Sequence, residues 1–557
     1  MSALASGAVR RFVAGLALCF AVAAGGVAHA QSVDMSGLPG GKPQRTGRPT
    51  ITPYIDVREF TQGALKGDAE TVTYAEAIAG LGVEYNTRRV ASTLFYTYTR
   101  RIRQQGDVGR SGSHNGIARA SIRIIPDVSA LDVGAIATYT RVNPAGAAPL
   151  GNVGNADNIS QVYGAYIQPS VATNISELDV ASSYRFSYVT TGNSTQGVPV
   201  TPGFDRFSDS VSHLATAQIG MKRGTLPFSW TLSSQYSRED SGQLNERFEN
   251  YNAILETRVP LSATIAFVSS GGYESSTNSK QSTLVDANGI PILDADGRFQ
   301  ADPSDPRVLT YDIAGFVADG GLIWSPSRRT HVEARAGYRY GGFTVTGLIE
   351  MKPDSKSSVA LVVFDRLESF GRGVTAGLAG APTQLQEPDD MGGSGSTPYS
   401  QCVFGKNPGM GSCLGGTLGS SASTMYRTRG MNFVYGYQMR QTSLNLGGGY
   451  SRRTYQDDPT LAVSLDGVVD QTIFVTGGLN HALSPKSSVD FSFNGNLFIN
   501  GQAGTPDVQS LVMNSRYSRI LGRSLIASAS VSVEASKREG DAADILGRAE
   551  LGVRYNF

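Results

Sequence analysis

The sequence has few cysteines and tryptophans, few lysines among its basic residues, and no long hydrophobic run after its first thirty residues. A membrane-spanning helix needs about 20 consecutive apolar residues, so a helical membrane protein is excluded. Only Cys402 and Cys413 follow the N-terminal region, and two thiols are too few for a structural zinc site. The formal net charge of +1 gives no basic footprint for nucleic acid.

The first thirty residues have the pattern of a secretory signal peptide. Arg10 and Arg11 precede an apolar stretch over 12–27, and Ala28-His29-Ala30 then forms a small-x-small cleavage site. The sequence therefore predicts a signal peptide over 1–30, cleaved after Ala30. An exported chain reaches an oxidising compartment, so Cys402 and Cys413 are candidates for a disulfide within a Gly/Ser-rich loop.

Alternation of apolar and polar residues is the dominant pattern after residue 50. At the C-terminus the apolar side chains are Ala549, Leu551, Val553, Tyr555 and Phe557, and the residues between them are Arg548, Glu550, Gly552, Arg554 and Asn556. Successive side chains of a strand point to opposite faces, so one face of this segment is apolar and the other polar. Similar segments recur along the chain, and in 131–139 only Ile136 breaks the alternation.

The lengths of these segments and of the gaps between them predict a membrane barrel. Most segments are longer than the ~5–6 residues of a soluble strand and match the ~9–11 of a tilted transmembrane strand. Short and long gaps broadly alternate, as in a barrel with short periplasmic turns and long outer loops. We therefore predict an all-β fold over 50–557: a transmembrane antiparallel up-and-down β-barrel of about 22 strands, range 18–24. Closure removes the unpaired sheet edges that lipid cannot hydrate, whereas a soluble β-sandwich or solenoid would have shorter strands.

Residues outside the strands complete the predicted domain organisation. An even number of strands places both termini on the periplasmic side. Residues 31–49 are rich in Gly and Pro and predict a disordered periplasmic leader, too short for a plug domain. The longest predicted outer loops cover about 275–307 and 371–429, and the second is the candidate for a constriction in a wide lumen.

The C-terminal residues predict the location of the barrel. Phe557, Tyr555 and Val553 at two-residue spacing resemble the outer-membrane sorting signal read by the barrel-assembly machinery. Together with the signal peptide, they predict the outer membrane of a Gram-negative bacterium, with outer-membrane lipid and that machinery as partners.

The polar faces of the strands predict the residues that line the lumen. The candidates are Arg58, Arg101, Arg119, Arg123, Arg185, Glu333, Arg335, Arg339, Arg516, Arg548, Glu550 and Arg554. Two interpretations remain open for them. They pair across strands and stiffen the wall, or they line a wet, weakly cationic channel for polar or mildly anionic solutes.

No residue pattern predicts an enzyme, a cofactor or a metal site. His331 and Glu333 could form a catalytic pair, but side chains two residues apart on one strand face are also what lumen alternation produces. Asp457, Asp458, Asp466 and Asp470 flank one long loop, and Asp296, Asp302 and Asp305 lie in another. Neither set has the fixed spacing of a calcium loop. We expect neither catalytic nor metal-binding residues, and no partner of nucleic acid type.

Four short runs resemble an outer-membrane β-barrel family that is associated with PEP-CTERM and exopolysaccharide loci. They are Ile51-Thr52-Pro53-Tyr54-Ile55, Gly116-Ile117-Ala118-Arg119, Asn158-Ile159-Ser160-Gln161-Val162-Tyr163, and Arg329-Thr330-His331-Val332-Glu333-Ala334-Arg335 leading to Arg339-Tyr340-Gly341. The resemblance implies an outer-membrane barrel near polysaccharide export, with export components as partners, and no catalytic residue.

Three functions therefore remain in view. The first is a passive pore or secretion conduit associated with exopolysaccharide export. The second is a structural barrel whose outer loops, stapled by Cys402 and Cys413, anchor polysaccharide or a partner protein. The third is an outer-membrane hydrolase that depends on His331.

Overall fold

The computed structural model of the chain describes residues 47–557 apart from several short segments. These segments are 68–69, 107–111, 143–157, 193–204, 223, 225, 243, 295 and 387–400. The predicted signal peptide over 1–30, and the leader over 31–49 except for its last three residues, lie outside the described residues.

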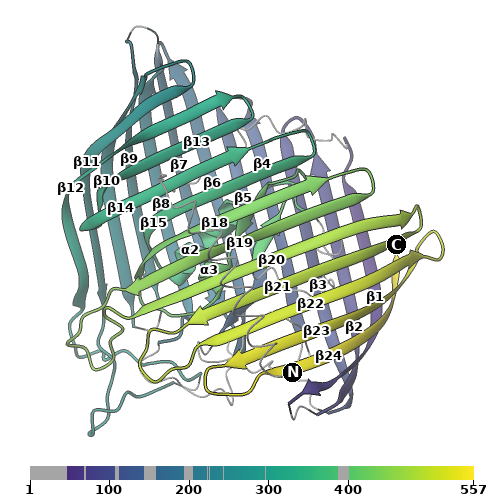
Figure 1. The fold of residues 1–557 in the computed structure, drawn as a ribbon. Helices are drawn as coiled ribbons and strands as arrows, with labels where there is room; N and C mark the ends of the chain where they lie inside the picture. The colour runs from purple at the N-terminus through teal and green to yellow at the C-terminus, as the bar shows by residue number, and fades with distance from the viewer. Residues whose placement is uncertain are drawn as a thin grey trace.

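Among the described residues, twenty-two strands form one sheet, and two helices and a small hairpin lie in the connection between β15 and β18 (Figure 1). The first eleven strands are β1 (Thr50–Lys66), β2 (Val72–Asn86), β3 (Val90–Gln105), β4 (Gly112–Ile125), β5 (Ser129–Arg141), β6 (Ile159–Ile175), β7 (Leu178–Thr191), β8 (Asp209–Met221), β9 (Ser229–Ser241), β10 (Glu246–Pro260) and β11 (Ile265–Lys280). The remaining strands are β12 (Val308–Ser327), β13 (Thr330–Arg339), β14 (Gly342–Met351), β15 (Ser357–Glu368), β18 (Tyr426–Gln438), β19 (Thr442–Tyr455), β20 (Val469–Ser484), β21 (Ser487–Ile499), β22 (Val508–Ile520), β23 (Leu525–Arg538) and β24 (Asp544–Asn556). Between β15 and β18 lie α2 (Phe370–Ala379), β16 (Cys402–Phe404), β17 (Gly411–Cys413) and α3 (Gly415–Leu418).

The sheet closes on itself. Each strand pairs antiparallel with its neighbour in the chain, β15 pairs with β18, and β1 pairs with β24. The predicted fold class is confirmed, because the chain forms a closed up-and-down barrel of 22 strands without an unpaired edge strand. The backbone N–H of Phe557 donates to the carbonyl of Pro53 at 3.1 Å, so β1 begins and β24 ends at the same end of the barrel.

The two ends of the barrel differ in their connections. At the end where β1 begins, which we call the turn end, every connection is short; they cover 87–89, 126–128, 176–177, 222–228, 261–264, 328–329, 352–356, 439–441, 485–486 and 521–524. The opposite end, the loop end, carries 142–158, 192–208, 281–307, 369–425 and 456–468. The structure thus has the separation of short and long connections that the gap lengths predict.

Two of the long connections start or end differently from the sequence prediction. The polar run 275–280 belongs to β11, and 426–429 belongs to β18. Both runs are polar on both faces, because the strands extend beyond the apolar part of the wall towards the loop end. Alternation is the signal that marks a strand in a sequence, so such an extension has the composition of a loop.

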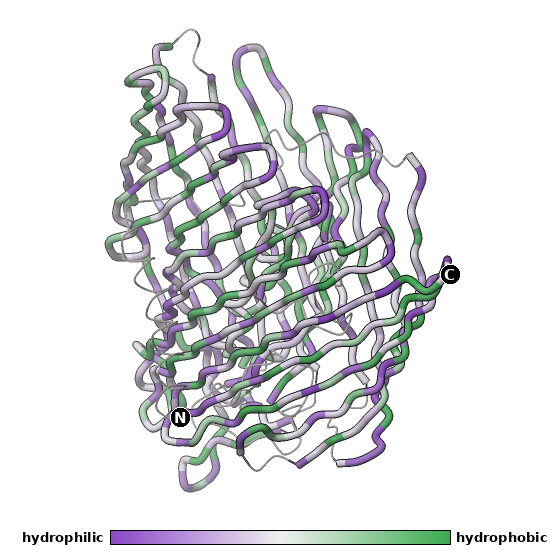
Figure 2. Tube along the Cα trace, turned by 45° about the vertical axis from the view of Figure 1, so that its right-hand side comes forward, coloured by the Kyte–Doolittle hydropathy of each residue, from purple (hydrophilic) through white to green (hydrophobic). Residues whose placement is uncertain are grey.

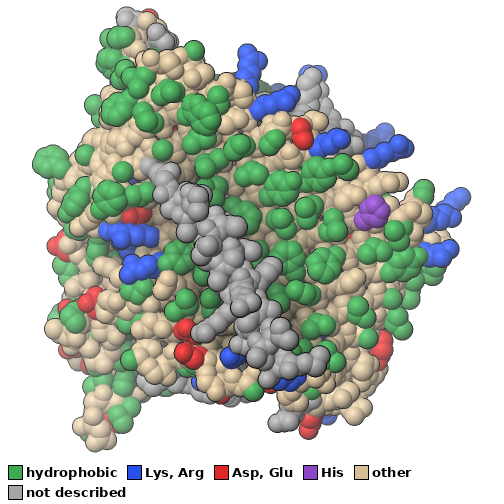
Figure 3. Space-filling model, viewed as in Figure 1, with side chains coloured by type: hydrophobic (Ala, Val, Ile, Leu, Met, Phe, Trp, Pro, Cys, Tyr) green, Lys and Arg blue, Asp and Glu red, His purple; other side chains and the backbone are tan. Residues whose placement is uncertain are grey.

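Alternating burial separates the two faces of the wall. In β1, Tyr54, Asp56, Arg58 and Phe60 are buried, whereas Ile55 and Val57 between them are exposed. Hydrophobic and hydrophilic residues alternate along the strands, and hydrophobic side chains cover much of the outer surface (Figures 2 and 3). Within the described residues, no helix has the length and hydropathy to cross a membrane. Because the outward side chains of the strands are apolar, they form the lipid-facing surface of a transmembrane barrel.

Candidate functional site in the barrel lumen

The described residues of the connection 369–425, namely 369–386 and 401–425, fold back into the barrel, and we call them the inner segment. Its two helices lie inside the ring of strands (Figure 1). Helix α2 contacts β5, β6, β7 and β8, and α3 contacts β5 on one side and β19 and β20 on the other. A lumen surrounded by 22 strands is too wide for wall side chains alone to fill, and the inner segment occupies part of it.

Local sequence explains why α2 forms. Ser369 is in an extended conformation and its side chain accepts a hydrogen bond from the backbone N–H of Arg372 at 3.2 Å, which caps the first turn. Phe370, Val374 and Leu378 recur every four residues and lie on one buried face of the helix.

This buried face packs on an apolar patch of the wall. The cluster joins Phe370, Val374, Leu378, Leu385, Val403, Leu414 and Leu418 to Phe95, Ile117, Ile136, Val162, Tyr166, Val189 and Phe207. Gly164 permits a close approach, because a Cβ atom there would lie 3.2 Å from Cγ1 of Val374. Ile136, the exception to the alternation of β5, therefore faces the lumen and contacts the inner segment.

Charged wall residues hold both ends of α2. Arg119 donates to the carbonyl oxygens of Ala381 at 3.0 Å and Ala379 at 3.1 Å, where the helix leaves unpaired carbonyls. At the other end, Glu239 accepts from the Ser369 hydroxyl and from Nε of Arg372 at 3.0 Å.

The far side of the inner segment rests on the opposite wall. Cys402 and Cys413 are joined by a disulfide within the β16–β17 hairpin. Cys402 packs with Phe404, Val434 and Phe474, and it is buried inside the barrel. The disulfide thus stiffens a segment in the lumen and not a loop on the cell surface.

The predicted lumen residues fall into three groups by exposure. The buried ones are Arg58, Arg101, Arg119, Arg185, Glu333, Arg335, Arg516 and Glu550. Arg339, Arg548 and Arg554 are partly exposed, and Arg123 is exposed near the turn end of β4.

Most of these residues form ion pairs. Arg58 contacts Asp56, Glu550 lies 3.2 Å from both Arg58 and Arg516, and Arg554 also lies 3.2 Å from Asp56. This cluster links β22, β24 and β1, where the barrel closes. Arg101 pairs with Glu76 at 2.9 Å.

A second cluster lies on β10, β12 and β13. Arg335 pairs with Glu256 at 2.7 Å, with Glu333 at 2.6 Å and with Asp319 at 3.4 Å. His331 lies 3.8 Å from Glu333 and 2.9 Å from the hydroxyl of Ser325. Because the Glu333 carboxylate is already engaged by Arg335, this arrangement differs from a hydrolase site whose acid orients the histidine.

Arg119 and Arg185 have a different environment. Both guanidinium groups lie over the ring of Tyr166, at 5.4 and 5.3 Å from its centroid, and Arg185 donates to Gln168 at 2.6 Å. Arg548 lies 5.3 Å from the ring centroid of Phe60 and donates to Ser532. These three arginines are held by aromatic rings and neutral acceptors within the lumen.

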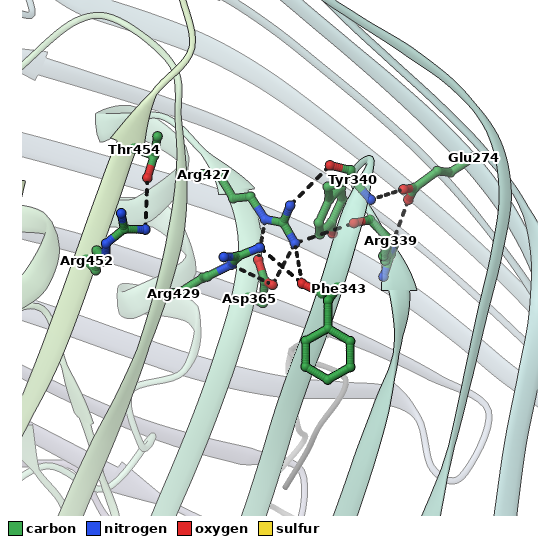
Figure 4. A network of polar contacts seen from close by, with 9 residues as sticks. All are labelled: Glu274, Arg339, Tyr340, Phe343, Asp365, Arg427, Arg429, Arg452 and Thr454. Atoms are coloured by element: carbon green, nitrogen blue, oxygen red, sulfur yellow. Dashed lines mark hydrogen bonds and ion pairs between the residues drawn. The ribbon is translucent and has the colours of Figure 1, made fainter. Parts of the chain in front are cut away.

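A third network lies at the loop end, where β13 and β15 end and β14 begins (Figure 4). Arg339 donates to Glu274 at 2.7 Å, and Arg427 donates to Asp365 at 2.8 Å and to the carbonyl of Tyr340 at 3.1 Å. The turn between β13 and β14 has positive φ at Tyr340 and Gly341, as a tight hairpin requires. Arg427 and Asp365 were not among the predicted residues, because Arg427 lay in the range assigned to a loop.

Other buried ion pairs also escaped the sequence analysis. Lys280 pairs with Asp457 at 2.8 Å and Arg453 pairs with Asp470 at 2.8 Å, and all four side chains are buried. Within the described residues, no group of three or more His, Cys, Asp or Glu could hold a metal ion. The helical spacing of Phe370, Val374 and Leu378 was one available signal for an ordered inner segment.

Comparison with known proteins finds a distant structural likeness only. No family model and no curated protein matches it. The FrpB iron transporter from Neisseria meningitidis is similar in structure, with 9% identity, a TM-score of 0.40, and coverage of 91% of this chain and 81% of that one. BauA, the ferric preacinetobactin receptor from Acinetobacter baumannii, has 11% identity, a TM-score of 0.41 and coverage of 91% and 81%. The Fiu ferric-catecholate import receptor from E. coli in its closed form has 10% identity, a TM-score of 0.41 and coverage of 91% and 82%. These likenesses are distant, and nothing about the lumen follows from them.

Proposed function

We propose that the chain is a passive outer-membrane channel for polar solutes, in which the inner segment is the constriction. The observation that carries this proposal is the position of 369–425, which contacts opposite walls of the lumen. The closed barrel with its apolar outer surface and polar inner face suits a pore in a membrane.

The paired charges favour neutral or weakly anionic solutes over strong cations. Asp56, Glu550, Glu333 and Glu76 all lie beside arginines, so few carboxylates on the wall attract cations. Arg119 and Arg185 add positive charge without a carboxylate in ion-pair contact among the described residues. The resemblance in sequence extends the proposal to polysaccharide secretion, with export components as partners.

Conductance in planar bilayers tests the constriction. Glu368 and Tyr426 are partners across the β15–β18 ladder, so an Asn-Gly turn can replace 369–425 and leave a tight hairpin. We expect low conductance from the full chain and a several-fold larger one from the shortened barrel. The matched control replaces 286–300, in the other long connection, by the same turn and leaves the conductance unchanged.

Failure of the shortened barrel to conduct, although it folds as judged by β-type circular dichroism, would overturn the channel. The polysaccharide part has a separate test. A strain that lacks the protein should secrete less polymer. If secretion stayed normal while the shortened barrel conducted, the role in polysaccharide secretion would be rejected and the channel function would be retained.

One observation favours a second candidate, a barrel that binds a partner through a surface loop. The connection 281–307 carries two hydrophobic residues, Val285 and Ile290, that are exposed. In this case the 286–300 replacement would abolish surface attachment of polymer or partner and leave secretion intact. The other predicted anchor, the loop with Cys402 and Cys413, lies in the lumen and does not serve this role.

A further inference from the structure

The ladder between β14 and β15 is shorter than its neighbours. It runs from Met351 paired with Val359 to Gly347 paired with Val363. The β15–β18 ladder continues to Glu368 paired with Tyr426, and the β13–β14 ladder to Arg339 paired with Gly342. The wall therefore has a notch at the loop end, between residues 342–346 of β14 and 364–368 of β15.

Two arginines of β18 bridge this notch (Figure 4). Arg427 and Arg429 both donate to the carbonyl oxygen of Phe343, at 3.2 and 3.0 Å. Both also donate to Asp365, at 2.8 and 3.0 Å. The guanidinium groups thus satisfy a carbonyl that pairing with β15 would otherwise satisfy.

The arginines lie on the outward face of the wall. Thr428 between them is buried in the barrel, as are Ser451 and Arg453 on β19, so Arg427, Arg429 and Arg452 have the outward parity. The side chain of Arg429 is 44% exposed. Figure 3 shows Lys or Arg side chains among hydrophobic ones on the left of the outer surface.

Arg429 and Arg452 are direct partners across the β18–β19 ladder. Like charges directly opposite each other destabilise a sheet. Arg452 donates to the hydroxyl of Thr454 at 3.3 Å, and no carboxylate of the described residues is ion-paired with it. Three outward guanidinium groups therefore face one carboxylate, Asp365. The bridging of the notch gives a structural reason for Arg427. It gives no reason for Arg452 or for the excess of positive charge over the single carboxylate of Asp365.

The cluster lies at the depth of a membrane interface. Tyr338 and Phe343 are paired across β13 and β14 and are exposed, and the adjacent Phe316 and Tyr273 continue this aromatic row. Aromatic rows mark the interfaces of membrane barrels. Towards the turn end, the outward residues of β18 become Met431, Phe433, Tyr435 and Tyr437. The guanidinium groups thus lie beside lipid headgroups, with apolar wall below them.

We propose that Arg429 and Arg452, beside the β14–β15 notch, bind the phosphate of an anionic lipid headgroup. The planar guanidinium offers paired N–H donors that match phosphate oxygens, and a phosphate between the two arginines removes their repulsion. Arg427 stays on Asp365 and Phe343 and holds the notch, while the acyl chains run along Met431 and Phe433. The site lies on the outside of the wall, so it is independent of whether the lumen conducts.

Lipid titration of the purified full chain, followed by native mass spectrometry, tests the site. The probes are lipid A, a phosphorylated glycolipid, and phosphatidylglycerol, with phosphatidylcholine as the zwitterionic comparison. We expect a retained anionic lipid on the wild-type chain and at least a tenfold lower affinity in Arg429→Ala/Arg452→Ala. The matched control, Arg328→Ala/Arg329→Ala, removes two exposed charges from the turn end and leaves the affinity unchanged.

Three results would overturn the site. They are equal binding of phosphatidylcholine, equal loss in the control variant, and displacement of the lipid by inorganic phosphate at low concentration, which would indicate a site for free anions. If the double variant fails to fold, the single variant Arg452→Gln tests the site instead. The Arg452 side chain donates only to Thr454 among the described residues, so its replacement should not disturb the fold. It should lower the affinity for the anionic lipids by several-fold, and an unchanged affinity would count against the proposal.

Discussion

The two longest connections at the loop end, 281–307 and 369–425, lie in different places. The first stays outside the barrel and builds its own turns, with Gly289 and Gly297 at positive φ. The second enters the lumen and packs on both walls. Seven of the 27 residues in 281–307 are charged, against five of the 57 in 369–425. A segment that enters the barrel must bury its side chains, and charged side chains are costly to bury without partners.

Local hydrogen bonds reinforce the difference. Asp286 accepts from the backbone N–H groups of Ile290 and Asn288, which lowers the pKa of its carboxyl group. Such turns satisfy the backbone without any wall. The inner segment instead takes its partners from the wall: two of its carbonyl oxygens accept hydrogen bonds from Arg119. The inner segment is thus ordered by the barrel, whereas the outer one orders itself.

The largest expected effect comes from charging the contact of α2 with the wall. Val374→Asp places a carboxylate among the apolar side chains of the cluster, beside Ile136 and Gly164, where burial of a charge is costly. We expect the inner segment to undock, with a conductance in planar bilayers that approaches that of the shortened barrel. The same change at an exposed position of the other connection, Ile290→Asp, should have no effect.

If Val374→Asp conducted as little as the wild-type chain while the shortened barrel conducted freely, the contact of α2 would be irrelevant to the constriction. The constriction would then depend on the β16–β17 hairpin alone.

The sequence was sufficient for the wall and insufficient for the lumen. Alternation along residues such as 549–557 determines which face meets lipid, and it repeats in almost every strand, so the barrel and its 22 strands could be predicted. The inner segment has no such repetition, because its order depends on contacts between residues far apart in the sequence, such as Arg119 and Ala381, which are 262 positions apart. Pairings such as Arg335 with Glu256 depend on register, which alternation alone does not give.

Two weaker signals could have indicated the inner segment. Ile136 interrupts the alternation of β5 with an inward apolar side chain, and such a residue needs an apolar partner in the lumen. The spacing of Phe370, Val374 and Leu378 supplies one. An exception to alternation is therefore informative in a barrel, because it marks where the lumen is filled.

A smaller effect is expected from removing the disulfide. Cys402→Ser/Cys413→Ser, or a reductant, should destabilise the hairpin by at most about 3 kcal/mol, the entropy of a loop of this size. The hairpin retains its packing on Val434 and Phe474, so we expect brief openings in single-channel records and not a permanent increase of conductance. A reductant should have no effect on the double variant, which serves as its control.

The smallest effect is expected at Arg119, on the wall side of the contact. Arg119→Gln keeps a donor but loses the charge and the reach of the guanidinium. The carbonyl oxygens of Ala379 and Ala381 then lose charged hydrogen bonds that together contribute about 1.5–3 kcal/mol, because water partly solvates the carbonyls once the bonds are broken. The apolar cluster still docks α2, and we expect openings about tenfold more frequent than in the wild-type chain. The matched variant Arg123→Gln, on the same strand but exposed near the turn end, should leave the record unchanged. Equal effects of the two substitutions would mean that the openings depend on positive charge in the lumen and not on the anchoring of α2. The inner segment would then be held by apolar contacts alone.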